Sequence, residues 1–211
     1  MEIGELFGDS FDYTKEALID KWMRWILLII SAIIFPLLAG YLLAVLRGEK
    51  PAPEPENWIK LLIDGIIVLI IGFIYSIPVF IIATLTMGTG MYAIMANPYS
   101  MGAGAGFFGI GMLLTCIAAI IISLIANIAI IRYARTEKIE ESFNFKEIIE
   151  KIHSLGWVDY FIKIFVLSIA IGILVFVVNI IPIIGFLIYI ALLPAIAIFS
   201  SRYLCLIYDS A

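Results

Sequence analysis

The sequence predicts an all-α integral membrane protein, built as one multi-pass helical bundle over residues 1–211. Two observations indicate this class. The chain is 64% hydrophobic and 14% charged with a mean hydropathy of +1.13, whereas soluble domains are about half apolar and a quarter charged. A membrane span needs only about 20 apolar residues, and five apolar segments occupy most of the chain: 22–46, 59–87, 107–131, 158–181 and 183–207.

The residues that precede the first apolar segment predict a surface helix. Between Asp9 and Arg24, charged side chains alternate with aromatic and aliphatic ones. This alternation is typical of a short helix that lies along the membrane interface.

The first apolar segment, 22–46, is interrupted by Pro36, and proline kinks or breaks a helix. A single kinked crossing is long enough to span, but it separates Lys15, Lys21 and Arg24 from the other basic residues. A hairpin that turns at Pro36 keeps them together, with two re-entrant arms of about 12 residues, or about 18 Å. We favour the hairpin, which leaves four full spans and one proline-broken segment.

The second segment, 59–87, carries Pro78 and leads into an uncharged stretch, 87–112, before the third segment. This stretch forms either an exposed loop or a segment folded back onto the bundle. Gly102 and Gly106 within it favour close helix packing, because small residues let membrane helices approach.

Three methionines, Met87, Met91 and Met95, are spaced by four and share one helix face. Soft thioether sulfur suits Cu(I). Flexible methionine also fills irregular interfaces without any metal. We favour packing, and we expect no metal and no cofactor.

The charged connection, 132–157, predicts an amphipathic helix on the membrane surface. Its apolar residues Phe145, Ile148, Ile149 and Ile152 fall at helical spacing, opposite charged side chains. Beyond it, Pro182 and the nearby Gly185 separate the last two apolar segments, which allows a tight hairpin.

The distribution of basic residues predicts the sidedness. Lys and Arg occur near the N-terminus, around residues 47–60, in the charged connection and just beyond it at Lys163, and at Arg202, whereas none occurs between Lys60 and Arg132. Basic loops favour the cytoplasm. We therefore expect a multi-pass protein of the cell membrane with its charged loops and C-terminus in the cytoplasm.

A boundary motif joins the first two segments. It comprises Gly40, Tyr41, Arg47, Glu49 and Trp58, followed by Asp64-Gly65 and Tyr75-Ser76-Ile77-Pro78. Together these residues resemble an archaeal multi-pass membrane protein family, domain of unknown function 4013 (DUF4013). The resemblance implies a multi-pass architecture and no established activity.

Three polar residues form a candidate intramembrane site: Asp64, Asn127 and Asn179. A carboxylate at membrane depth is usually functional and suits a cation or a proton. Alternatively, Asp64 stays near the interface and pairs with Lys60 at i,i+4, which we favour. The two asparagines are better suited to bridging helices. The only histidine, His153, lies on the polar edge of the surface helix.

The expected function is non-enzymatic. A net charge of −4 argues against a nucleic-acid partner, and no catalytic constellation is apparent. We expect a scaffold or accessory subunit that acts on lipids or partner proteins, with membrane lipids, other membrane proteins or a second copy as partners. A small transporter or channel with a site near Asp64, Asn127 and Asn179 is the alternative. A membrane enzyme comes third.

Overall fold

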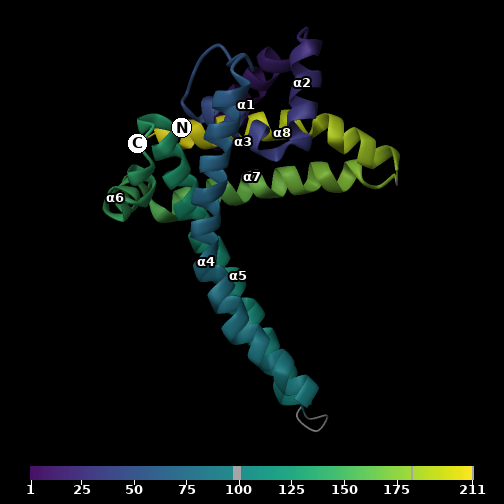
Figure 1. Cartoon of the computed structure of the whole chain (residues 1–211), viewed down its shortest axis with the longest axis vertical. Coiled ribbons are helices and arrows are strands. Elements are labelled where there is room, and N and C mark those ends of the chain that lie inside the picture. The colour runs from purple at the N-terminus through teal and green to yellow at the C-terminus, as the bar shows by residue number, and fades with distance from the viewer. Residues whose placement is uncertain (97–100, 182, 211) are drawn as a thin grey trace. The chain divides into compact units, whose positions relative to one another are not determined.

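The computed structural model describes residues 1–96, 101–181 and 183–210, which form helices joined by turns and short loops (Figure 1). This confirms the all-α class. In chain order the helices are α1 (Ile3–Leu18), α2 (Trp22–Ile33), α3 (Phe35–Leu46), α4 (Trp58–Ala96), α5 (Met101–Thr136), the 3₁₀ helix η2 (Ile139–Phe143), α6 (Phe145–Leu155), α7 (Trp157–Val178) and α8 (Ile184–Asp209).

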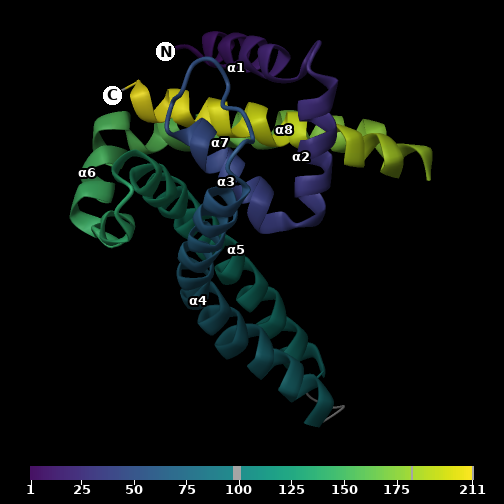
Figure 2. The same ribbon diagram turned by 45° about the horizontal axis from the view of Figure 1, so that its top comes forward.

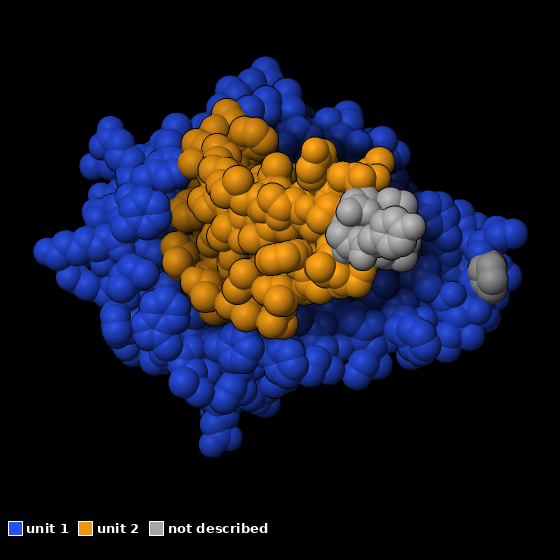
Figure 3. Space-filling view, turned by 90° about the horizontal axis from the view of Figure 1, so that it is seen from below, with its two compact units in different colours: residues 1–69, 128–211 blue, residues 70–127 orange. Residues whose placement is uncertain are grey.

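The chain divides into two compact units. Unit 1 comprises residues 1–69 and 128–211, and unit 2 comprises residues 70–127 (Figure 3). Unit 2 therefore consists of the adjoining parts of α4 and α5. Unit 1 holds the remaining parts of these two helices together with all the others.

Within the described residues, four helices are long and apolar enough to cross a membrane: α4, α5, α7 and α8. Two of them, α4 and α5, contain 39 and 36 residues and are longer than the apolar segments that predict them. They are longer because the uncharged, glycine- and methionine-rich stretch is helical on both sides of residues 97–100. The exposed-loop alternative is therefore wrong for residues 87–96 and 101–112.

Glycines bring the two helices of unit 2 into backbone contact. A Cβ atom at Gly90 would lie 2.5 Å from the backbone nitrogen of Phe108, and one at Gly104 would lie 2.9 Å from that of Ile94. By contrast, Gly102 and Gly106 face open space. Close glycine packing is confirmed: Gly111, where a Cβ atom would lie 2.8 Å from the Thr86 carbonyl carbon, provides it together with Gly90 and Gly104, whereas Gly102 and Gly106 do not.

The first apolar segment is a hairpin of two packed helices, α2 and α3, each of 12 residues. The break falls at Ile34, and Pro36 lies in the first turn of α3, where its missing N–H is not needed. The loop that follows α3 lies against the start of α2, because the Arg24 guanidinium donates to the Glu54 carboxylate and, at 3.5 Å, to the Ala52 carbonyl. The chain thus returns to its starting point, as the hairpin alternative requires.

A glycine crossing joins α3 to the start of α4. A Cβ atom at Gly40 would lie 1.9 Å from the carbonyl oxygen of Leu61, and one at Gly65 would lie 1.7 Å from that of Pro36. Neither position has room for a side chain. This explains in physical terms why Gly40 and Gly65 belong to the boundary motif.

In unit 1, α1 packs antiparallel on α8, and the two chain termini lie close together (Figure 2). The Phe7 ring is 5.6 Å from that of Phe199 and 5.2 Å from that of Tyr203, between centroids. The surface helix expected before the first apolar segment therefore packs on another helix of the chain. It also begins earlier than expected, at Ile3. The core beneath it contains Tyr13, Ala17, Leu18, Leu28, Leu38, Tyr41, Val45, Ala52 and Ile198.

A hydrogen bond from Trp25 joins α2 to α8 close to a proline inside the latter. Pro194 lies inside α8 and provides no N–H for the carbonyl of Ile190. Next to that carbonyl, the oxygen of Ala191 accepts a hydrogen bond of 2.8 Å from the Trp25 indole N–H. The indole thus binds the α8 backbone close to Pro194.

The predicted amphipathic helix exists as α6, and protein covers part of its apolar face. Asn144 caps its first turn by accepting from the Glu147 N–H, and Gly156 ends it with a φ of 81°. Ile148 and Ile152 are fully buried in the chain itself. Part of this face thus packs on α7, whereas Phe145 stays exposed and Ile149 half-buried on the same helix.

The last two apolar segments form a hairpin, as predicted. A Cβ atom at Gly185 would lie 2.1 Å from the carbonyl oxygen of Val178. In addition, the Tyr203 hydroxyl of α8 donates to the Lys163 carbonyl of α7 at 3.2 Å. Pro182, which predicts this turn, lies outside the described residues.

We expect Gly65→Ala to destabilise the protein and Gly72→Ala to leave it intact. The added methyl at Gly65 forces α3 and α4 apart, at a cost of about 1–3 kcal/mol. Gly72, also on α4, faces open space, and alanine favours a helix there. Thermal unfolding in detergent measures both effects, and equal melting temperatures for the two variants would contradict the crossing.

Candidate functional site: a charged network at the helix ends

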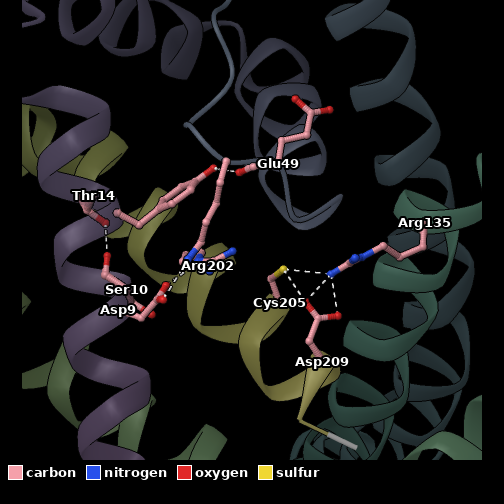
Figure 4. A network of polar contacts seen from close by, with 10 residues as sticks. Asp9, Ser10, Thr14, Glu49, Arg135, Arg202, Cys205 and Asp209 are labelled. Atoms are coloured by element: carbon pink, nitrogen blue, oxygen red, sulfur yellow. Dashed lines mark hydrogen bonds and ion pairs between the residues drawn. The ribbon is translucent and has the colours of Figure 1, made fainter.

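Charged side chains gather in unit 1 where several helices end (Figure 4). At its centre, Arg135 near the end of α5 donates from Nε to the Leu46 carbonyl of α3 at 3.1 Å. Its Nη2 atom lies 2.8 and 2.7 Å from the two carboxylate oxygens of Asp209 and 3.1 Å from the Cys205 sulfur, both on α8. One guanidinium therefore holds the ends of three helices together.

The turn after α3 is shaped to receive this guanidinium. Gly48 has a φ of 83°, a left-handed conformation that favours glycine, and a Cβ atom there would lie 3.0 Å from the Arg135 nitrogens. Glycine at this position therefore serves both the turn and the approach of Arg135.

A second arginine, Arg202, joins α8 to α1. Its Nε donates to Asp9 at 2.8 Å, and its guanidinium lies 4.9 Å from the centroid of the Tyr13 ring. Asp9 also accepts from Lys50 at 3.1 Å, and the Tyr13 hydroxyl donates to the Glu49 carbonyl at 3.0 Å. The first helix is thus tied to both the last helix and the loop after α3.

These contacts change the pKa of the Asp9 carboxyl. Partial burial raises the pKa of its carboxyl, but the hydrogen bonds and charges of Arg202 and Lys50 outweigh this effect, so the pKa lies below its ordinary value.

A third arginine, Arg47, binds Asp64 and corrects the expected pairing. Asp64 is buried, and its carboxylate accepts from Arg47 at 2.8 Å rather than from Lys60. Glu137, just after α5, lies 3.1 Å from Arg47 and 3.5 Å from Lys60. Asp64 is therefore part of a four-residue charge cluster at the start of α4.

At the end of α5, Arg132 binds the connection that leads to α6. Its guanidinium donates to Glu141 and lies 3.7 Å from Glu147. The hydrogen bond from Arg132 lowers the pKa of the Glu141 carboxyl. His153 is exposed, as expected, and its ring lies 6.0 Å from that of Trp157.

The other polar candidates have local roles. Asn179 ends α7, is exposed, and donates to the Val175 carbonyl of its own helix at 2.8 Å. Asn127 is half-buried in α5 at the boundary of unit 2. Asp64, by contrast, is held by Arg47. The structure thus gives Asp64 and Asn179 separate partners.

The three methionines lie on α4 in unit 2, with Met91 and Met95 exposed. Among the described residues, no three His, Cys, Asp or Glu side chains gather as metal ligands. In the boundary motif, Tyr41 is buried, Trp58 begins α4 and Pro78 lies exposed inside that helix.

Sequence reasoning missed several members of the network: Asp9, Arg24, Arg135, Cys205 and Asp209. It treated Arg202 only as a marker of sidedness. One signal was present, because Arg202 is a basic residue within an apolar segment, and such a charge needs a counter-ion.

With this geometry in place, the comparison with known families is informative. A family model described as a protein of unknown function (DUF4013) matches residues 25–184. The chain belongs to the DUF4013 family. No curated protein and no solved structure matches the chain.

The DUF4013 match confirms the resemblance and covers much of the network. The matched range includes α3 to α7 and therefore the Gly40–Gly65 crossing, Arg47 with Asp64, and Arg135. It excludes α1 and all but the first residue of α8, so the Asp9–Arg202 pair lies outside it.

We expect acid to weaken the DUF4013 fold through Asp9. Because its folded pKa lies below the unfolded value of about 3.9, its stabilisation is complete above that pH and disappears as the pH falls through the folded pKa. Asp9→Asn should therefore lower the melting temperature at pH 7 and reduce its further fall on acidification. Asp12→Asn, exposed on the same helix, is the control. If both variants follow the wild-type pH profile, Asp9 does not contribute in this way.

We expect Arg135→Lys to destabilise the protein despite its retained charge. A lysine cannot reach the Leu46 carbonyl and both Asp209 oxygens together, because it lacks the planar fork of arginine. In a double-mutant cycle with Asp209→Asn, the two losses should be non-additive by about 0.5–3 kcal/mol. Additive losses would show that the pair is not coupled.

Proposed function

We propose that the chain is a non-enzymatic membrane scaffold or accessory subunit that acts on lipids or partner proteins in an archaeal cell membrane. The exposure of its long apolar helices carries this proposal. Only 11% of the most apolar window is buried in α4 and α7, and 22% in α5 and α8. These surfaces are thus left to lipid or to other proteins, as a subunit of an assembly requires.

The charged network supports the same role. Its cations bind carboxylates and carbonyls of other segments, as Arg135 does with Asp209 and Leu46. Pairing of this kind fixes helix ends relative to one another. A rigid charged platform on one side of the membrane suits a scaffold. By the bias of basic residues towards the cytoplasm, we place this platform and both termini there.

A small transporter or channel is the alternative. Its best support is a hollow of about 430 Å³ between α4 and α5 of unit 2, which includes Tyr75, Ser76, Thr115 and Ser123. However, three of these hydroxyls donate to carbonyls of their own helices, at 2.6 to 2.8 Å. Donors used in this way are less available to a solute. A membrane enzyme is the third possibility.

Reconstitution separates the first two proposals. We expect the pure protein in liposomes to conduct no cations above the level of empty liposomes, and we expect its mass in native lipid particles to exceed that of one chain. Flux that is lost in Asn127→Leu but kept in Asn179→Leu would overturn the scaffold proposal in favour of a transporter. A strictly monomeric particle without bound protein would leave only lipids as its partner.

A further inference from the structure

In unit 1, α1 carries charged side chains along its whole length and exposes them to solvent. The helix has 16 residues and is about 24 Å long. The exposed charged residues on it and beside its ends are Glu2, Glu5, Asp12, Lys15, Glu16 and Asp20. Each would cost about 2.5–3.5 kcal/mol at the centre of a bilayer. The outer face of α1 must therefore stay in water.

This helix covers more than half of α8. Its Phe7 contacts Tyr203, and its Asp9 contacts Arg202, which is buried. Farther along, Phe11 and Thr14 share an apolar hollow of about 330 Å³ with α8 residues as far back as Leu192. Residues 192–207 of α8 thus run beside a helix that cannot enter hydrocarbon.

The rest of α8 is too short to cross a membrane. Only Ile184–Ala191 extends beyond the part covered by α1, which is about 12 Å of helix. The hydrocarbon core is about 30 Å thick. If the hairpin of α7 and α8 stood upright across the bilayer, the charges of α1 would have to enter the core with it.

The partner helix α7 carries an apolar stripe on its opposite side. Ala170, Ile171 and Leu174 face the hollow beneath α1. At 100° per residue, six exposed apolar residues point away from it along the full length of α7; they are Val158, Ile162, Phe165, Ile169, Ile173 and Phe176. Further exposed residues, among them Leu174 and Val177, lie off this stripe. One face of this three-helix layer is therefore charged and the other apolar.

We propose that the hairpin of α7 and α8 lies in the plane of one leaflet and does not cross the bilayer. The stripe of α7 then enters the acyl chains, α1 remains in water, and the turn between α7 and α8 stays at headgroup level. This interaction surface goes beyond the proposed function and does not depend on it.

Cysteine labelling in sealed vesicles tests the proposal. In a chain with Cys116→Ala and Cys205→Ser, single cysteines replace Ile181 at the turn, Lys146 on α6 and Met95 near the far end of α4, all exposed positions. We expect an impermeant maleimide to label Ile181→Cys from the same side as Lys146→Cys and from the side opposite Met95→Cys. Labelling of Ile181→Cys together with Met95→Cys, or from neither side, would overturn the proposal.

The depth of spin labels in the bilayer is a second measurement, and a misfolded variant would not reproduce the expected depths. Labels at Phe165 and Ile173 lie eight residues apart on the stripe, or about 12 Å along the helix axis. In-plane placement predicts nearly equal depth in the acyl region, with a label at Asp12 in water. A depth difference of about 12 Å would show an upright helix. Each variant must first elute as the wild type does.

Discussion

The charge of Arg202 dictates how the larger unit is assembled. This arginine lies within the last apolar helix and is 4% exposed. Burying a guanidinium without a counter-ion is strongly destabilising. Its counter-ion, Asp9, belongs to the first helix, so α1 must lie along α8 for the charge to be neutralised. The edge-to-face contact of Phe7 with Tyr203 and the burial of Tyr13 accompany that placement.

The same constraint recurs at other helix ends. Arg24 reaches Glu54, Arg47 reaches Asp64 and Arg135 reaches Asp209, each in another segment of the chain. Each pair neutralises a guanidinium; those of Arg47 and Arg135 also join two helix ends, and that of Arg24 joins α2 to the loop after α3. Neutralising these charges therefore also determines how the helices are arranged. Glycine contacts such as that at Gly65 determine how closely the helices approach one another.

Local sequence patterns predicted the helices, whereas the side chains that pair between helices lie far apart in the sequence. Pro36 at the middle of an apolar segment sufficed to predict the α2–α3 hairpin, and helical spacing sufficed for α6. The pairing of Asp64 was missed because the i,i+4 rule considers one helix only, and Arg47 lies on another. The helicity around Gly90 was missed because backbone packing outweighs the low helix propensity of glycine.

The pairing of α1 with α8 has a consequence for biosynthesis. Asp9 and Arg202 are separated by 193 positions, and Trp25 and Ala191 by 166. Because a ribosome delivers the chain from its N-terminus, the partners of α1 and α2 are made last. The α4–α5 hairpin has its contacts within reach as it emerges. The N-terminal helices must therefore wait, incompletely packed, until α8 is released, which makes that interval the vulnerable stage of folding for this protein.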